Sequence, residues 1–180
     1  MTTADEAKRL RTMSHEAMLA ERAPWPDRAA AGDTAAASAL GAYFYARGER
    51  DVAACWLEQA AAGGDPEGLC ALGQLRQEDG DATAAEGLYA RAAAAGQVTS
   101  INHLTAFALQ RGDRAAAEDW AGRAARAGDV NGMINYGVLL LASGRNEEAK
   151  TWFGTALQAG GIGVWRQITK QVEMSGLTLP

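Results

Sequence analysis

The stretch from Gly128 to Ala159, GDVNGMINYGVLLLASGRNEEAKTWFGTALQA, decides the fold because the chain repeats its pattern three times before it. A shift of 32 residues toward the N-terminus places Gly128 on Gly96, and further shifts reach Gly64 and Gly32. Other positions recur with the same period: Gly144, Gly112, Gly80 and Gly48; Ala149, Ala117, Ala85 and Ala53; Ala156, Ala124, Ala92 and Ala60. An internal repeat of this length is typical of a solenoid built from stacked units.

Composition favours an all-α chain and restricts the partners. The 180 residues are rich in the helix formers Ala, Leu, Glu and Arg, and only four prolines interrupt them. A net charge of −5 repels phosphate backbones, so we expect no nucleic-acid partner. The longest apolar run, 138–142, is far shorter than the roughly 20 residues of a membrane helix. The first residues lack the apolar core of a secretory signal, and we therefore expect a cytoplasmic protein.

Three segments follow from the repeat. Residues 1–31 contain a predicted amphipathic helix over 4–22 and a connector in which Pro24 and Pro26 flank Trp25. We expect Trp25 to lie over the exposed end of the solenoid. Residues 32–159 hold four repeats, 32–63, 64–95, 96–127 and 128–159, and residues 160–180 form a capping helix and tail. The apolar stripe Trp165, Ile168 and Val172 marks that cap.

Each repeat is predicted to be two antiparallel helices. The first helices are expected over 34–47, 66–79, 98–111 and 130–143, and the second over 50–62, 82–95, 114–127 and 146–159. The glycine after each first helix can adopt the left-handed conformation that ends a helix. Asp81 and Asp113 follow as N-caps of second helices, and Asp33, Asp65 and Asp129 precede first helices in the same role.

The buried face of the first helices is equally regular. Two columns recur at helical spacing: Leu69, Ile101 and Met133; then Leu40, Leu72, Leu104 and Tyr136. A glycine column inside these helices, Gly41, Gly73 and Gly137, implies close approach of the second helix, and the small residues expected opposite are Ala53, Ala85, Ala117 and Ala149. Thr105 interrupts the glycine column and predicts looser packing in the third repeat.

Large residues form two columns on the second helices: Trp56, Leu88, Trp120 and Trp152; then Leu57, Tyr89, Ala121 and Phe153. We expect them to wedge between neighbouring units, and this packing interpretation is preferred to an aromatic ligand cage.

The sequence carries no recognisable catalytic or metal-binding motif. His15 and His103 lie in different elements without an evident acidic or nucleophilic partner, and HxxxH, HExxH and CxxC spacings are absent. Cys55 and Cys70 fall on helices that pack together in this architecture, but we interpret them as reduced thiols in or near the core. No catalytic residue, cofactor or metal is therefore predicted.

The repeats resemble tetratricopeptide repeats, and more closely their bacterial relatives, the Sel-one-like repeats. The shared features are the Leu-Gly pair of the first helix, as in Leu72-Gly73, and the second-helix series Ala85, Leu88-Tyr89, Ala92-Ala93 and Gly96. The period of 32 is shorter than the roughly 34 residues of tetratricopeptide repeats, and their inter-repeat proline is missing.

The resemblance implies a right-handed superhelix whose first helices line a concave groove for peptides or protein segments. The groove residues carried over are Ser38, Ala42, Tyr45, Glu67, Cys70, Gln74, Gln77, Thr99, Asn102, Ala106, Leu109, Asn131, Ile134, Val138 and Leu141. Gln74, Gln77 and Asn102 would hydrogen-bond a peptide backbone, and Leu109, Ile134 and Val138 would hold an apolar anchor. In the alternative interpretation Leu109 and Ile134 belong to the core and the glutamines are only solvated.

The predicted function is therefore a non-catalytic protein- or peptide-binding scaffold. A structural homo-oligomer that shares Trp25 or Trp165 between chains remains an alternative. A small-molecule enzyme would require a polar enclosed cavity with a perturbed titrating group, which the sequence does not indicate.

Overall fold

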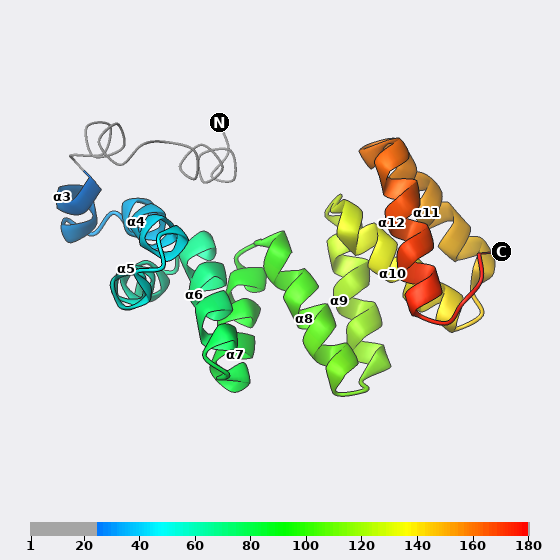
Figure 1. Cartoon of the computed structure of the whole chain (residues 1–180), viewed down its shortest axis with the longest axis horizontal. Coiled ribbons are helices and arrows are strands. Elements are labelled where there is room, and N and C mark those ends of the chain that lie inside the picture. Colours follow the sequence, from blue (N-terminus) through cyan, green and yellow to red (C-terminus); the bar gives the residue numbers. More distant parts are fainter. Residues whose placement is uncertain (1–24, 180) are drawn as a thin grey trace. The chain divides into compact units, whose positions relative to one another are not determined.

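The computed structural model describes residues 25–179, so the helix predicted over 4–22 lies outside the described residues. Within that range all regular secondary structure is α-helical (Figure 1). The helices are α3 Trp25–Ala30, α4 Thr34–Ala46, α5 Arg50–Ala62, α6 Pro66–Glu78, α7 Ala82–Ala94, α8 Val98–Gln110, α9 Arg114–Arg126, α10 Val130–Ala142, α11 Asn146–Gly160 and α12 Ile162–Met174. The predicted all-α solenoid class and its helix pairs are confirmed.

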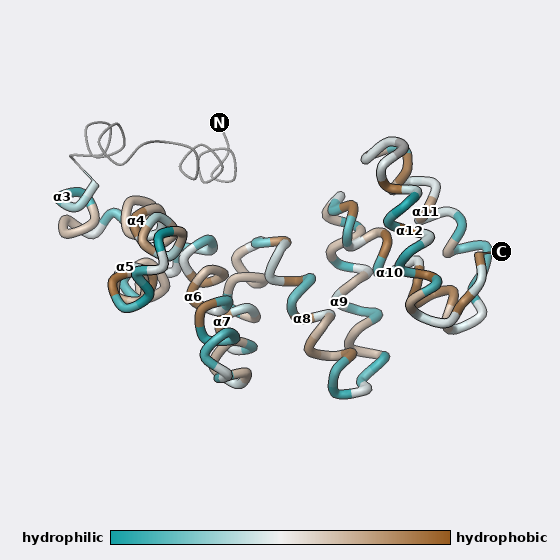
Figure 2. The backbone as a smooth tube through the Cα atoms, in the orientation of Figure 1, coloured by the Kyte–Doolittle hydropathy of each residue, from teal (hydrophilic) through white to brown (hydrophobic). Residues whose placement is uncertain are grey.

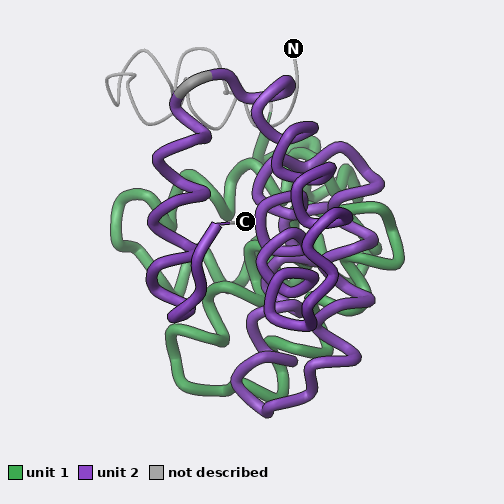
Figure 3. Tube along the Cα trace, turned by 90° about the vertical axis from the view of Figure 1, so that its right-hand side faces the viewer, with its two compact units in different colours: residues 1–97 green, residues 98–180 purple. Residues whose placement is uncertain are grey.

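The helices pack as consecutive antiparallel pairs, α4 with α5, α6 with α7, α8 with α9 and α10 with α11. They form two compact units, residues 1–97 and 98–180, which Figure 3 colours separately. In unit 1, α3 packs on α4, and both α4 and α5 pack on α6. In unit 2, α9 packs on α10, and α12 packs on both α10 and α11.

Glycine and aspartate define the helix ends as predicted. The Asp81 carboxylate accepts a hydrogen bond from the Ala84 backbone N–H, and Asp113 accepts one from Ala116, each at 3.0 Å. Asp33, Asp65 and Asp129 cap first helices in the same way. The glycines after the first helices all have positive φ: Gly48 at 80°, Gly80 at 85°, Gly112 at 74° and Gly144 at 78°. Each helix therefore ends where its sequence permits the left-handed residue.

The glycine column faces large side chains, so the prediction that it meets the alanine column is wrong. A Cβ atom on Gly73 would lie 2.9 Å from Cε1 of Tyr89, and one on Gly137 would lie 2.4 Å from Cε1 of Phe153. Gly41 stands in the same relation to Leu57. The glycines therefore make room for a bulky residue of the following helix.

The third repeat exchanges the sizes of this pair. Thr105 replaces glycine on α8, and Ala121 replaces the bulky residue on α9. Thr105 is 1% exposed and Ala121 is fully buried. Alanine in place of a bulky residue removes more volume than threonine in place of glycine adds, so the exchange compensates only in part. The packing between α8 and α9 is the least extensive of the four helix pairs, which agrees with the looser packing predicted from Thr105.

Burial separates the two second-helix columns. Leu57, Tyr89, Ala121 and Phe153 are buried, whereas Trp56, Leu88, Trp120 and Trp152 are half-buried. Tyr136, predicted as core, is also half-buried and lies edge-on to Trp152 with ring centroids 5.5 Å apart. The Arg123 guanidinium lies 4.2 Å from the Trp120 ring centroid. The half-buried column thus lies at the edge of the hydrophobic core rather than at its centre.

The two ends differ from prediction in detail. Residues 25–30 of the predicted connector form the short helix α3, and Trp25 packs against the first-repeat cluster that includes Ala36 and Leu40. At the other end, Val164, Ile168 and Val172 form the buried stripe of α12, while Trp165 is 49% exposed. The prediction that Trp165 belongs to the buried stripe is therefore wrong.

Figure 2 shows that hydrophobic and hydrophilic residues are interspersed along every labelled helix. Among the described residues, no helix has both the length and the apolar character needed to cross a membrane.

The glycine contact gives a stability prediction. Gly137→Ala places a methyl group against the Phe153 ring, and we expect the free energy of unfolding to fall by about 1–3 kcal/mol. Gly154→Ala is the matched control, because a Cβ atom there meets nothing within 4 Å. Removing a helix-interior glycine at that open site raises stability by about 0.5–1 kcal/mol. Urea unfolding of both variants tests the contact, and equal effects would contradict it.

Candidate binding site

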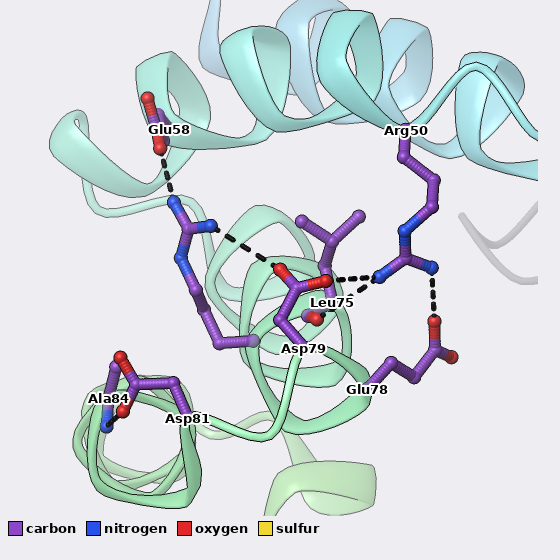
Figure 4. Close-up of polar contacts among 8 residues, drawn as sticks. Arg50, Glu58, Leu75, Glu78, Asp79, Asp81 and Ala84 are labelled. Carbon is purple, nitrogen blue, oxygen red and sulfur yellow. Dashed lines mark hydrogen bonds and ion pairs between the residues drawn. The ribbon is translucent and has the colours of Figure 1, made fainter.

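In unit 1, a network of ion pairs joins the first two repeats (Figure 4). Arg50, the first residue of α5, reaches the C-terminal end of α6, where Nη1 lies 2.6 Å from Glu78 Oε2 and Nη2 lies 2.7 Å from Asp79 Oδ1. The Tyr45 hydroxyl of α4 donates a hydrogen bond to the other Glu78 oxygen. The Arg50 guanidinium therefore pairs with two carboxylates, and one of these, Glu78, also accepts a hydrogen bond from the Tyr45 phenol.

A second arginine extends the network. Arg76 donates a hydrogen bond to Glu58 of α5, and its Nη1 lies 3.6 Å from Asp79 Oδ2. Asp79 is thus placed between two guanidinium groups, as Figure 4 shows. All these side chains are at least 30% exposed, so solvent screens the ion pairs. Their main effect is therefore to hold the side chains in place rather than to add stability.

Titration of the network follows from its hydrogen bonds. The Tyr45 hydroxyl and then the Arg50 guanidinium lower the pKa of Glu78 from its ordinary value of 4.5. Hydrogen bonds from Arg50 to Glu78 and then to Asp79 raise the pKa of the arginine. Glu78 and Arg50 are therefore a charged pair at neutral pH.

The same positions in unit 2 carry different chemistry. Two repeats further along the chain, Arg50 corresponds to Arg114, the first residue of α9. The remaining equivalences are Tyr45 to Leu109, Leu75 to Leu139, Glu78 to Ala142 and Asp79 to Ser143. The arginine is retained, but both carboxylates and the phenol are lost.

These five residues of unit 2 line a cavity of about 250 Å³. The rest of its wall is Glu118 of α9, Asn135 and Val138 of α10, Gln171 of α12, and Ser175 and Leu177 of the tail. In unit 1, α4 lies directly on α6, whereas the corresponding helices α8 and α10 are farther apart. The residues equivalent to Tyr45, Glu78 and Asp79 therefore border an open cavity in unit 2.

Most polar groups of the wall bond to other groups of unit 2. Glu118 accepts a hydrogen bond from Arg145, and Gln171 Nε2 donates to Asn135 Oδ1 at 3.0 Å. The hydroxyls of Ser143 and Ser175 each donate to a backbone carbonyl of their own helix, at 2.9 Å. The Arg114 guanidinium makes no hydrogen bond or ion pair with another described residue. Arg114 is thus the cavity's available cation.

The groove residues predicted in unit 1 have mixed outcomes. Glu67, Gln74 and Gln77 are exposed, and Tyr45 is half-buried within the network. Gln77 Oε1 accepts a hydrogen bond from the Tyr89 hydroxyl at 2.9 Å. Cys70 is only 8% exposed and belongs to the core, so its placement on the groove surface is wrong. Ser38 is likewise buried, and Ala42 is half-buried.

Of those predicted in unit 2, Thr99, Ala106 and Asn131 are exposed, and Leu109 is 47% exposed. The alternative that Leu109 is a core residue is therefore wrong. Asn102 is half-buried and donates to Asp129 Oδ1 at 2.9 Å, while Asn131 accepts from Gln167 of α12 at 2.6 Å. These two amides therefore bond within the unit.

Ile134, Val138 and Leu141 were predicted as groove lining, but they are only 1%, 8% and 9% exposed. All three belong to the hydrophobic cluster of unit 2 together with Ile168 and Val172 of α12. Because α9, α11 and α12 all pack on α10, its apolar face is covered. Val138 still borders the cavity, so it and Leu109 are the two predicted residues that the structure brings together there.

The remaining candidates for chemistry are dispersed. His103 is half-buried, and this burial lowers its pKa. Cys70 is buried and Cys55 is exposed, with no disulfide between them, so the core placement of Cys55 is wrong. Among residues 25–179 no group of three or more His, Cys, Asp or Glu side chains is arranged to hold a metal ion.

A scan against protein-family models finds no match, and a search of curated proteins finds no relative. The resemblance to tetratricopeptide and Sel-one-like repeats therefore rests on the repeat residues themselves.

The network gives a pH prediction. Because the folded-state pKa of Glu78 is lowered, its contribution is present at neutral pH and disappears as the pH falls through that lowered pKa. Glu78→Gln should therefore lower the thermal midpoint slightly at pH 7 and should not lower it once Glu78 is protonated. Asp119→Asn, an exposed carboxylate outside the network, is the control. A Glu78→Gln effect of equal size at acid and neutral pH would contradict the charged pair.

Proposed function

We propose that this protein is a non-catalytic scaffold that binds a protein or peptide segment, with the unit 2 cavity as a principal contact. The observation that carries the proposal is the cavity between α8, α9, α10 and α12, which combines Arg114, Asn135 and Gln171 with Leu109, Leu139 and Leu177. Such a mixture of apolar wall and a few directional polar groups suits an amphipathic side chain of a partner.

The size of the cavity supports a side-chain ligand rather than a free metabolite. Its volume of about 250 Å³ is below the roughly 300–1,000 Å³ typical of small-molecule sites. Leu109 is 47% exposed at the wall, where a bound segment would cover it. Peptide binding by helical-repeat proteins, implied by the resemblance, is consistent with this use.

The test is peptide selection from a random display library against the intact protein. We then expect Leu109→Asp to weaken the selected peptides by about tenfold or more, because it places a charge on the apolar wall. Val52→Asp is the matched control, since Val52 is 41% exposed on α5 of unit 1.

Equal affinity of the two variants for the selected peptides would refute the cavity as the contact. Selection of no binding peptide at all would count against peptide binding altogether.

Self-association is the second candidate, and one observation favours it. Trp165 occupies the α12 position equivalent to Met133, which is 6% exposed, yet Trp165 is 49% exposed. A second copy that covers this face would make the mass from light scattering increase with concentration, and Trp165→Ser would abolish the increase. A constant monomer mass across concentrations would exclude this candidate.

A further inference from the structure

We propose that the unit 2 cavity recognises an acidic side chain, Glu or Asp, carried next to an apolar residue on the partner segment. Arg114 would bind the carboxylate. The inference rests on the proposed function and adds the chemistry of the partner.

The repeat itself shows which group the arginine position binds. Arg50 and Arg114 follow the same type of turn, Gly48-Glu49 in one case and Gly112-Asp113 in the other, and both begin a second helix. In unit 1 the two Nη atoms of Arg50 meet carboxylate oxygens of Glu78 and Asp79. The guanidinium fork matches this arrangement, because its planar donors pair with carboxylate oxygens.

In unit 2 the acceptors are missing while the arginine remains. Ala142 and Ser143 stand where Glu78 and Asp79 would be, and the Ser143 hydroxyl already donates to the Leu140 carbonyl. The cavity is lined by the residues that stand in place of those carboxylates and of Tyr45. A carboxylate supplied from outside would restore the arrangement that the chain builds for itself in unit 1.

The acid already in the wall does not substitute for that carboxylate. Glu118 is one helical turn from Arg114 but accepts its hydrogen bond from Arg145. Arg145 is in turn held by both oxygens of Glu148, at 2.8 Å each. Glu118, Arg145 and Glu148 together leave one net negative charge beside Arg114, which favours a singly charged carboxylate over a doubly charged phosphate.

The apolar part of the wall defines the neighbour of the acid. Leu109 replaces Tyr45 and removes the hydroxyl that in unit 1 bonds Glu78. Leu139, Leu177 and the edge of Val138 continue this surface. An aliphatic side chain next to the acid would therefore be buried against Leu109 while the carboxylate reaches Arg114.

The test compares two blocked tripeptides by titration of the ¹⁵N-labelled protein in nuclear magnetic resonance. The probes are acetyl-Leu-Glu-Leu-amide and acetyl-Leu-Gln-Leu-amide, which differ only in the carboxylate. We expect the glutamate peptide to shift the signals of Leu109, Arg114 and Ser143 and to bind about tenfold more tightly than the glutamine peptide.

Variants assign the preference to Arg114. Arg114→Gln should make the two peptides equal in affinity, and Arg114→Lys should retain part of the preference, since it keeps the charge but not the fork. Arg126→Gln on the same helix makes the same change in net charge away from the cavity wall and should leave the preference intact. Arg114 is exposed, so its variants should retain the wild-type thermal midpoint.

The outcomes separate this inference from the proposed function. Equal binding of both peptides at the cavity, unchanged in Arg114→Gln, would overturn the acidic preference and leave peptide binding standing. Tighter binding of inorganic phosphate than of the glutamate peptide would overturn the carboxylate assignment. If neither peptide at about 10 mM shifted the signals of the cavity residues, the carboxylate assignment would also be overturned. The Leu109→Asp comparison would then test the proposed function independently.

Discussion

The structure depends on one backbone constraint, a glycine with positive φ just after each helix of residues 25–179. From Gly32 to Gly144 such a glycine occurs every 16 residues. A residue with a Cβ atom would resist this left-handed conformation at roughly 1–2 kcal/mol per site. Each helix from α4 to α10 is accordingly 13 residues long, although their sequences differ. Constant helix length keeps every column of side chains in register.

Because the punctuation is local, helix boundaries were predictable from sequence within a residue or two. The 16-residue glycine spacing ends at α11, which continues to Gly160 before Gly161 takes positive φ. Lateral packing was less predictable, since glycine spacing indicates close approach without saying which residue approaches. Gly73 and Gly137 thus receive Tyr89 and Phe153 rather than an alanine.

The site was only partly predictable for the same reason. The columns identify Leu109 and Val138 as residues of one face, but burial depends on how many helices pack around each position. Because α12 covers α10, Ile134 and Leu141 are core residues. Asn102 donates its hydrogen bond to the cap residue Asp129. The cavity itself had a sequence signal. Glu78-Asp79 become Ala142-Ser143 in register while the arginine at Arg50 and Arg114 is retained.

In a repeat protein, equivalent positions provide an internal comparison of occupied and open sites. The first unit satisfies its arginine from its own α6, which ties two repeats together. The second unit keeps the arginine, places Leu109 beside it and leaves a cavity. We infer that this cavity is open because two carboxylates are missing. A crystal structure of the Ala142→Glu, Ser143→Asp double variant tests it most directly. We expect the Arg114 guanidinium to pair with both new carboxylates, as Arg50 does with Glu78 and Asp79, and the new side chains to fill the cavity. A cavity that stays open, with Arg114 bonded to neither carboxylate, would contradict it.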